Sequence, residues 1–260
     1  FRECWQSRRP AGPAPQRGVP LHAAYAVHEQ PGVLDAPATR KLLADWRIPQ
    51  PVELIVPNGD ALVEQAVAAA GSMGWPVAIK IVSPDIAHKT EAGGVELDLA
   101  GAPQAREACE RILRNVRSRQ PGARIDGLQV QRMMPPGREM VVGVARDPDF
   151  GPMVMLGLGG IHVEVLGDTV FGLAPLSHED ALGMIGRLKG RAILDGVRGE
   201  PPADIEALAA LLVSVSELAA AHAGSIAEID LNPVLVYPAG RGAVAVDALV
   251  VAACADGGSH

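Results

Sequence analysis

The sequence predicts a domain of the α/β or α+β class, and two observations carry this prediction. From Pro37 onward, segments with helical spacing of apolar residues alternate with short β-like runs that are apolar throughout or at every second position. Hydrophobic residues make up 48% of the 260 residues, which is enough for a sizeable core. No internal repeat is visible, and the length fits one large domain or two lobes.

The charge balance and the cysteines exclude several classes of function. The 23 Lys and Arg residues against 30 Asp and Glu residues give a net charge of −7, which repels a nucleic-acid backbone. No stretch is long and apolar enough for a membrane-spanning helix. The three cysteines lie far apart and form no zinc-binding or disulfide pattern. We therefore expect a cytoplasmic protein that binds neither nucleic acid nor a membrane.

The N-terminal segment differs in composition from the rest of the chain. Residues 1–32 contain several prolines and two adjacent arginines, but no apolar run of the kind found in a secretory signal. We predict that residues 1–32 are a flexible arm or linker, that residues 33–253 form the folded part, and that residues 254–260 are a C-terminal tail.

Hydrophobic spacing predicts the order of elements in the first half of the folded part. A helix at 38–46 precedes a strand at 52–56, and residues 58–60 can cap a second helix that Gly71 and Gly74 end. The run PVAIKIVS then predicts a strand, as does VELDL at 95–99. A third helix at 105–119 has Ala108, Ile112 and Val116 on its inner face.

Three strands follow, and the final third adds two helices and three further strand-like runs. The strands are predicted at 125–133, 138–146 and 151–159, and the helices at 177–188 and 204–222. The last three runs are IAEIDLNPV, VLVYP and AVAVDALV. The mixture of both element types throughout the chain supports the predicted class.

The first candidate for a chemical role is Lys80, within PVAIKIVS. Alternation places Val77, Ile79 and Ile81 on one face of this strand and Lys80 on the other. If Lys80 is buried, its ammonium group needs an anionic partner, because an unpaired buried charge is costly. The alternative is an edge strand whose lysine reaches water.

Two loops carry glycines and polar groups that suit phosphate chemistry. The segment SPDIAHKTEAGGV holds His88 and ends in a glycine pair, and a loop histidine can give or accept a proton or a phosphoryl group. The second loop, GLGGIHVE, contains Gly159, Gly160 and Glu164, and His162 is a weaker candidate. Neither loop is a P-loop or a Rossmann fingerprint. A surface loop and a tight turn are the alternative explanations.

The third group of polar residues lies on the last strands. In IAEIDLNPV, alternation places Glu228, Asp230 and Asn232 on one face, and Asp247 interrupts the Ala/Val run that follows. If the two strands pair across the turn at 238–242, Asn232 and Asp247 converge. Their oxygens are of the type that Mg²⁺ takes together with phosphates and water. An exposed sheet face is the alternative.

Together these segments resemble a known family. The runs AIKIVSPDIAHKTEAGGV, VQRMMPPGREMVVGVARDPDFGPMVMLGLGGIHVEV, EIDLNPVLV and VAVDA, in this order, resemble the ATP-grasp (β) part of NDP-forming acyl-CoA synthetases of the ADP-forming acetate–CoA ligase type, which are relatives of succinyl-CoA synthetase. The resemblance extends over about residues 33–251. It implies an ATP-grasp fold, in which two lobes grip ATP or ADP, with a hinge near 131–134.

The resemblance also implies roles for individual residues. Lys80 would bind the nucleotide phosphates, the strand from Gln131 to Met133 would contact adenine, and Glu139 would complete the nucleotide site. Asn232 and Asp247 would hold Mg²⁺. The proposed catalytic group comprises His88 as the transiently phosphorylated histidine, Asp230 as the acid that orients it, and Glu164. Gly159 and Gly160 would contact phosphate or a partner loop.

The same resemblance implies an incomplete enzyme. The CoA-binding and flavodoxin-like domains of the family are absent from these 260 residues, so a CoA-binding α subunit or fused α domains would be needed. Phosphoryl would pass from an α histidine to His88 and then to ADP. Two other functions remain open at this point: a stand-alone ATP-grasp carboxylate–amine ligase, and a non-catalytic nucleotide-sensing module.

Overall fold

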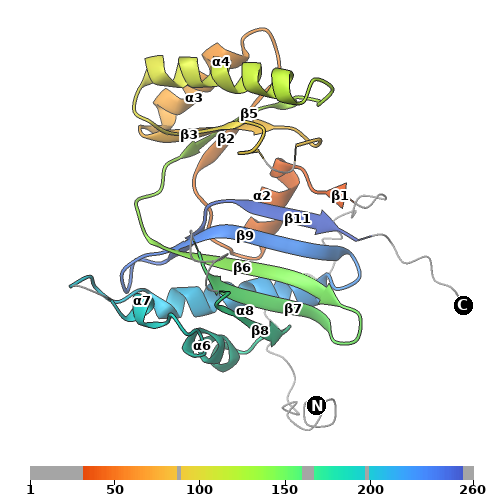
Figure 1. Cartoon of the computed structure of the whole chain (residues 1–260), viewed down its shortest axis with the longest axis vertical. Coiled ribbons are helices and arrows are strands. Elements are labelled where there is room, and N and C mark those ends of the chain that lie inside the picture. Colours follow the sequence, from red (N-terminus) through yellow and green to blue (C-terminus); the bar gives the residue numbers. More distant parts are fainter. Residues whose placement is uncertain (1–31, 87–88, 160–166, 197–198, 254–260) are drawn as a thin grey trace, which may run out of the picture.

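The computed structural model describes residues 32–86, 89–159, 167–196 and 199–253, which form two lobes, each built on its own antiparallel sheet (Figure 1). Most of the buried hydrophobic side chains fall into two separate clusters, one in each lobe. No helix of these ranges is long and apolar enough to cross a membrane.

The N-terminal lobe has a four-stranded sheet in the order β2-β5-β3-β4, covered on one face by two helices. Its elements are β2 (Glu53–Pro57), α3 (Leu62–Met73), β3 (Val77–Val82), β4 (Val95–Leu99), α4 (Ala102–Arg119) and β5 (Gly127–Arg132). In Figure 1 both helices lie on the side of this sheet that faces away from the other lobe. The opposite face of the sheet is therefore turned toward the C-terminal lobe.

The C-terminal lobe has the larger sheet, in the order β1-β11-β9-β6-β7-β8, with β10 also paired to β9. Its strands are β1 (Gly32–Val33), β6 (Arg138–Asp147), β7 (Gly151–Leu158), β8 (Thr169–Leu173), β9 (Ile226–Val236), β10 (Ala243–Ala245) and β11 (Ala248–Ala252). Its helices are α2 (Ala36–Asp45), α6 (His178–Gly186), α7 (Ala192–Asp195) and α8 (Ile205–Ala221).

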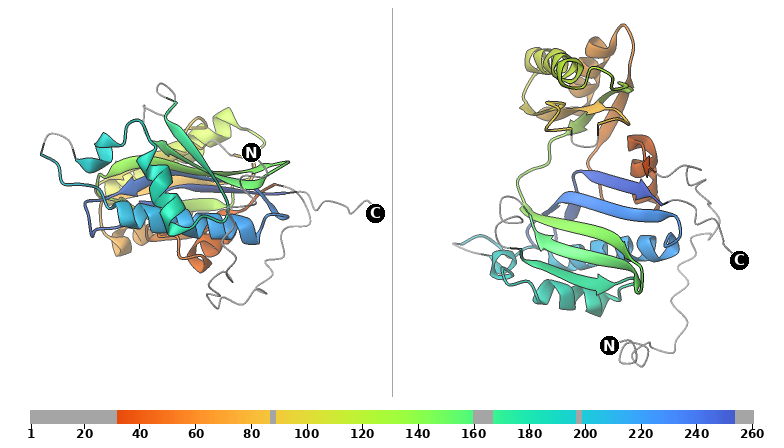
Figure 2. Two further views of the ribbon diagram at one scale, coloured as in Figure 1. Left: turned by 90° about the horizontal axis from the view of Figure 1, so that it is seen from below. Right: turned by 45° about the vertical axis from the view of Figure 1, so that its right-hand side comes forward.

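Helix α2 precedes the N-terminal lobe in sequence but packs in the C-terminal lobe. Leu42 and Leu43 of α2 belong to the same hydrophobic cluster as Leu231 of β9 and Val250 of β11. The chain therefore crosses between the lobes twice, once after α2 and once between β5 and β6 (Figure 2). As a result, a side chain of α2, which is held by the C-terminal lobe, can contact a residue of the N-terminal lobe.

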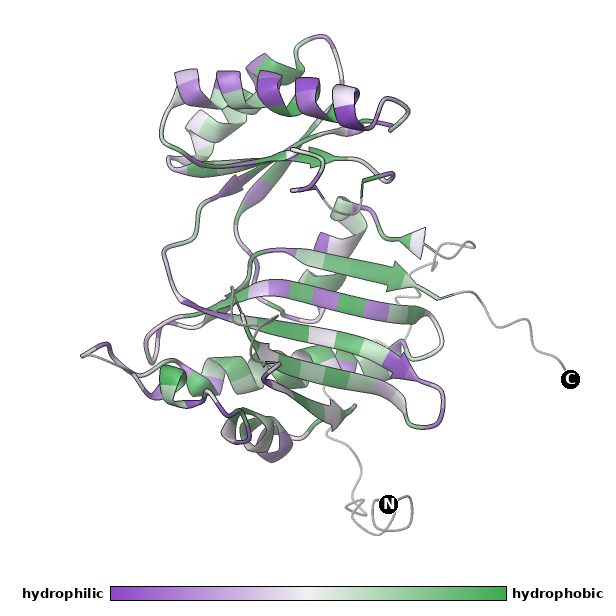
Figure 3. Ribbon diagram, viewed as in Figure 1, coloured by the Kyte–Doolittle hydropathy of each residue, from purple (hydrophilic) through white to green (hydrophobic). Residues whose placement is uncertain are grey.

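Helix α4 shows how apolar spacing fixes the packing of the N-terminal lobe. Its residues Ala105, Ala108, Ile112 and Val116 are fully buried, and their spacing of three or four places them on one helical face. The opposite face is hydrophilic, as the colouring of α4 in Figure 3 shows. The predicted inner face is therefore confirmed, although the helix begins at Ala102, three residues before the predicted start.

Four details differ from the sequence-based expectations. Residues 58–60 do not cap α3, because the Asn58 side chain donates to the Ile125 carbonyl and the cap position is Ala61, which makes no side-chain bond. Gly71 lies within α3, which ends at Gly74. The two runs IAEIDLNPV and VLVYP contribute to one continuous strand, β9, whereas AVAVDALV is split into β10 and β11. Strands β1 and β8 and helix α7 were not predicted.

A half-buried histidine at the end of α8 contacts Trp46 at the end of α2, and this contact is predicted to be sensitive to acid. His222 lies edge-on to Trp46 with ring centroids 6.1 Å apart, and partial burial lowers the pKa of its imidazole below the ordinary value of 6.5. Because the unfolded chain then binds the proton more tightly, stability is lost as pH falls below about 6.5. We expect the melting temperature to fall over this range, and His222→Gln to lose that part of the pH dependence. Thermal unfolding between pH 7.5 and 5.5 measures both, and identical pH profiles of the two proteins would contradict it.

Candidate functional site

Lys80 lies in the interior of the N-terminal sheet and faces the C-terminal lobe. Its strand, β3, is paired on both sides, with β5 and β4, so it is not an edge strand. Lys80 is only 5% exposed, and its Nζ lies 3.4 Å from a carboxylate oxygen of Asp247. The prediction that a buried Lys80 has an anionic partner is confirmed. The alternative of an edge lysine in water is wrong.

Asn232 and Asp247 lie next to each other, at the break between the last two strands. Asn232 lies in β9, and Asp247 lies in the break between β10 and β11, both of which pair with β9. The Asn232 backbone N–H donates to the Asp247 carbonyl at 3.2 Å. The predicted convergence of these two residues is therefore present. The two residues meet at the break between β10 and β11. The turn at 238–242, which was predicted to bring them together, joins β9 to β10 only.

The side-chain oxygens of Asn232 and Asp247 are suitable ligands for a hard cation that takes its other ligands from outside the protein. Asp247 is 43% exposed at its side chain, and one of its carboxylate oxygens accepts from the Ala248 backbone N–H. Within the part of the chain that the structure describes, no group of three or more His, Cys, Asp or Glu side chains could form a complete metal cage. An amide and a carboxylate oxygen suit Mg²⁺, which usually takes its remaining ligands from phosphates and water.

Asp230 lies on the same face of β9 as Asn232. Ile229 and Leu231, on the other face, are buried in the core of the C-terminal lobe, which confirms the predicted alternation. Asp230 is half-buried, and burial, together with the negative charges of Glu228 and Asp247, raises the pKa of its carboxyl group. Asp230 is therefore part of the acidic surface around Asp247.

The predicted adenine-binding stretch lies where the chain leaves the N-terminal lobe. The side chain of Gln131 is nearly inaccessible, and its Nε2 donates to the Val246 carbonyl of the C-terminal lobe at 2.8 Å. The Met133 backbone N–H donates to the Pro76 carbonyl at 3.1 Å. Glu139 is an exposed residue of β6. Gln131, Met133 and Glu139 therefore lie along the segment of chain that connects the N-terminal lobe to the C-terminal lobe.

Gly159 has a packing reason for being glycine. Its N–H donates to the Glu139 carbonyl at 2.7 Å, and a Cβ at this position would lie 2.6 Å from the backbone carbonyl carbon of Glu139. The close approach of the end of β7 to β6 thus excludes a side chain. The remaining candidates His88, Gly160, Glu164 and His162 lie outside the described residues.

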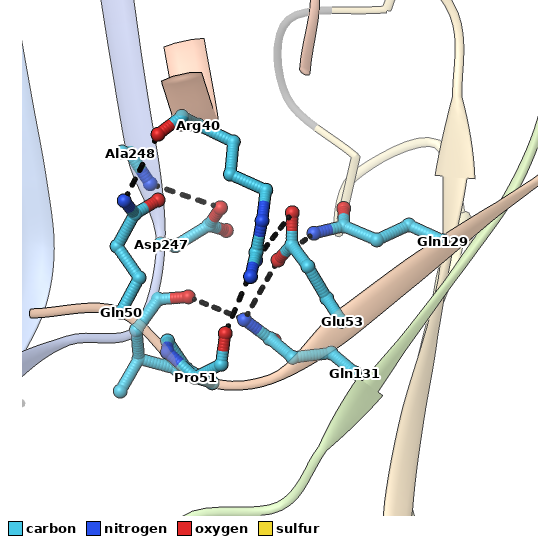
Figure 4. A network of polar contacts seen from close by, with 9 residues as sticks. Arg40, Gln50, Pro51, Glu53, Gln129, Gln131, Asp247 and Ala248 are labelled. Carbon is cyan, nitrogen blue, oxygen red and sulfur yellow. Dashed lines mark hydrogen bonds and ion pairs between the residues drawn. The ribbon is translucent and has the colours of Figure 1, made fainter. Parts of the chain in front are cut away.

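A polar network between the lobes was missed by the sequence analysis (Figure 4). The Glu53 carboxylate pairs with Arg40 of α2 at 3.3 Å and accepts from Gln129 at 2.6 Å and from Gln131 at 3.5 Å. A small cavity of about 40 Å³ adjoins it, and its lining includes Arg40, Gln50, Glu53, Lys89, Gln129 and Asp247. Polar residues at alternate positions of the otherwise apolar run GLQVQR were the signal that could have revealed it.

Comparisons with known proteins agree with this geometry. Residues 25–252 match the ATP-grasp domain family. The β subunit of acetate–CoA ligase [ADP-forming] I from Pyrococcus furiosus is 46% identical over 215 residues, which cover 83% of this chain and 90% of that subunit. Acetate–CoA ligase [ADP-forming] I from Archaeoglobus fulgidus is 47% identical over 191 residues, which cover 73% of this chain but only 28% of that protein.

A solved structure shows the same fold. A chain of acetyl-coenzyme A synthetase 1 from Candidatus Korarchaeum cryptofilum, solved in complex with coenzyme A and Ca-AMPCP, has a TM-score of 0.80 and 38% identity. The match covers 85% of this chain and 94% of that chain. The predicted ATP-grasp fold and the predicted resemblance are both confirmed. The chain belongs to the ATP-grasp family and, within it, to the β subunits and equivalent domains of ADP-forming acetate–CoA ligases.

Proposed function

We propose that this chain is the nucleotide-binding component of an ADP-forming acyl-CoA synthetase. With a CoA-binding α partner it would catalyse the reversible conversion of acyl-CoA, ADP and phosphate into a carboxylic acid, CoA and ATP. The observation that carries the proposal is the approach of the buried Lys80 to Asp247 across the two lobes, with Asn232 beside it. A buried cation on one lobe that faces a carboxylate on the other, with Asn232 next to that carboxylate, supports the binding of nucleotide phosphates between the lobes.

The residues have separate tasks in this proposal. Lys80 neutralises charge on the nucleotide phosphates, the main chain of the stretch from Gln131 to Met133 contacts adenine, and Glu139 completes the nucleotide site. The buried Gln131 side chain takes no part in this contact, because it bonds to Glu53 and Val246. Asn232 and Asp247 would hold Mg²⁺, which supplies positive charge at the phosphates when bound. Phosphoryl transfer asks mainly for position and for neutralising charge, and these groups provide both.

His88 is proposed as the phosphoryl carrier of this component, with Asp230 orienting it. The neutral imidazole nitrogen of His88 would attack the phosphorus of the α phosphohistidine, whose ring nitrogen leaves. The new N–P bond would then break when a terminal phosphate oxygen of ADP attacks the same phosphorus, which forms ATP and frees the imidazole. Lys89, the next residue in the chain, lines the cavity beside Asp247, which supports a position for this segment near the phosphates. Glu164, Gly159 and Gly160 are proposed to contact the phosphoryl group or the partner.

The proposal is tested by reconstitution. The chain is mixed with a CoA-binding α subunit, acetyl-CoA, ADP, phosphate and Mg²⁺, and ATP formation is measured with each component omitted in turn. We expect ATP only when all are present. ATP consumption that requires a carboxylate and an amine but no CoA would favour the carboxylate–amine ligase, and nucleotide binding without any turnover would favour the sensing module.

A further inference from the structure

Glu53 stands at the centre of the contacts that join the two lobes. It is 9% exposed at its side chain, and its two carboxylate oxygens divide their partners: Oε1 pairs with Arg40, and Oε2 accepts from Gln129 and Gln131. Arg40 also donates to the Pro51 carbonyl at 3.1 Å. Because α2 packs in the C-terminal lobe, the Arg40 contact ties Glu53 of the N-terminal lobe to that core.

Gln131 completes the connection back to the C-terminal lobe. Glu53 and Gln131 lie directly opposite each other on β2 and β5, so their side chains share one face of the sheet. Both neighbours of the Gln131 amide, the Glu53 carboxylate and the Val246 carbonyl, are acceptors. The NH₂ group must therefore point at both, which fixes its orientation. Its stronger contact is to the residue that immediately precedes Asp247.

We propose that Glu53 is a positioning residue that acts through Gln131 on the turn at Val246 and Asp247. Arg40 holds the Glu53 carboxylate, Glu53 orients the Gln131 amide, and Gln131 holds the Val246 carbonyl. This sets the place of the Asp247 carboxylate relative to Lys80 of the N-terminal lobe. The inference rests on the proposed function, in which Asp247 is a Mg²⁺ ligand, and adds the group that aligns this ligand.

Glu53→Gln tests the inference, because it keeps the shape of the side chain but removes its charge. The new NH₂ group would compete with the amides of Gln129 and Gln131 for the same space. We expect the Mg²⁺ concentration for half-maximal ADP binding to rise about tenfold, the scale on which partners of metal ligands affect metal affinity. ADP affinity in the presence of EDTA should change less than about twofold. Calorimetric titration of the purified chain with ADP at a series of Mg²⁺ concentrations measures both.

Two further variants separate positioning from general damage. Gln131→Met removes only the amide, so it should show the same Mg²⁺ defect, and the double variant should be no worse than either single one. Glu64→Gln is the matched control, since its exposed ion pair with Arg106 joins α3 to α4, on the side of the N-terminal sheet that faces away from the other lobe. It should behave as wild type.

The outcomes are distinct. Additive effects of Glu53→Gln and Gln131→Met, an unchanged Mg²⁺ titration, or an equal loss of ADP affinity with and without Mg²⁺ would each overturn the positioning role. If Glu53→Gln fails to fold, Gln131→Met carries the same test by itself. A folded wild-type chain that shows no Mg²⁺-dependent ADP binding would instead overturn the proposed function, and this inference with it.

Discussion

Replacing Lys80 with methionine is expected to lower the kcat/KM of the reconstituted enzyme for ADP by about 10²- to 10³-fold, the usual effect of removing one preorganised charge-stabilising group. Lys80 is 5% exposed, so little water screens its charge. Methionine has a similar length but no charge. The fold should persist, because the Asp247 side chain is 43% exposed and keeps its hydration after the ion pair is lost.

The effect should be larger on kcat than on nucleotide binding, because charge moves along the phosphates in the transition state. Lys41→Met is the matched control: Lys41 lies on α2, is 65% exposed at its side chain, and pairs with Asp45. It should leave kcat/KM within about twofold of wild type. Steady-state kinetics and a thermal melt of each variant decide the matter, and a well-folded Lys80→Met enzyme that loses less than about threefold would refute the role.

Periodicity allowed most elements and their buried faces to be predicted. In α4 the apolar residues recur every three or four positions, and in β9 Ile229 and Leu231 alternate with polar residues; both patterns hold in the structure. Lys80 could be singled out for a physical reason, since a charge within an apolar strand requires either water or a counter-charge. The sequence pattern alone could not decide between these two, because the neighbouring strands determine which is available.

The features that could not be predicted depend on contacts between distant segments. The Gln131 side chain bonds to Val246, which is 115 positions further along the chain, and Arg40 meets Glu53 only because α2 packs in the other lobe. No local pattern encodes such a pairing. The split of AVAVDALV into β10 and β11 has the same origin, since both segments pair with β9 and Asp247 falls at the break between them.

His88→Asn should abolish phosphoryl transfer while leaving nucleotide affinity almost intact. Asparagine keeps a polar side chain of similar reach but has no nucleophilic ring nitrogen, so no phosphoramidate can form. We expect turnover of the reconstituted enzyme to fall by at least about 10⁴-fold, the scale of loss when a nucleophile is removed. ADP affinity should change less than about twofold, because Lys80, Asn232 and Asp247 remain.

The decisive measurement is the transfer of label from γ-labelled Mg-ATP to the protein, scored for an acid-labile and base-stable product in the presence of the α partner. His178→Asn is the control, since His178 is an exposed residue at the start of α6 that pairs with Glu206. It should retain both label and turnover. Full turnover by His88→Asn would exclude a covalent role for this histidine and shift the evidence toward direct acyl phosphate chemistry on a carboxylate. Loss of label together with loss of ADP binding would instead assign His88 to nucleotide binding, because a pure carrier leaves the ground-state complex unchanged.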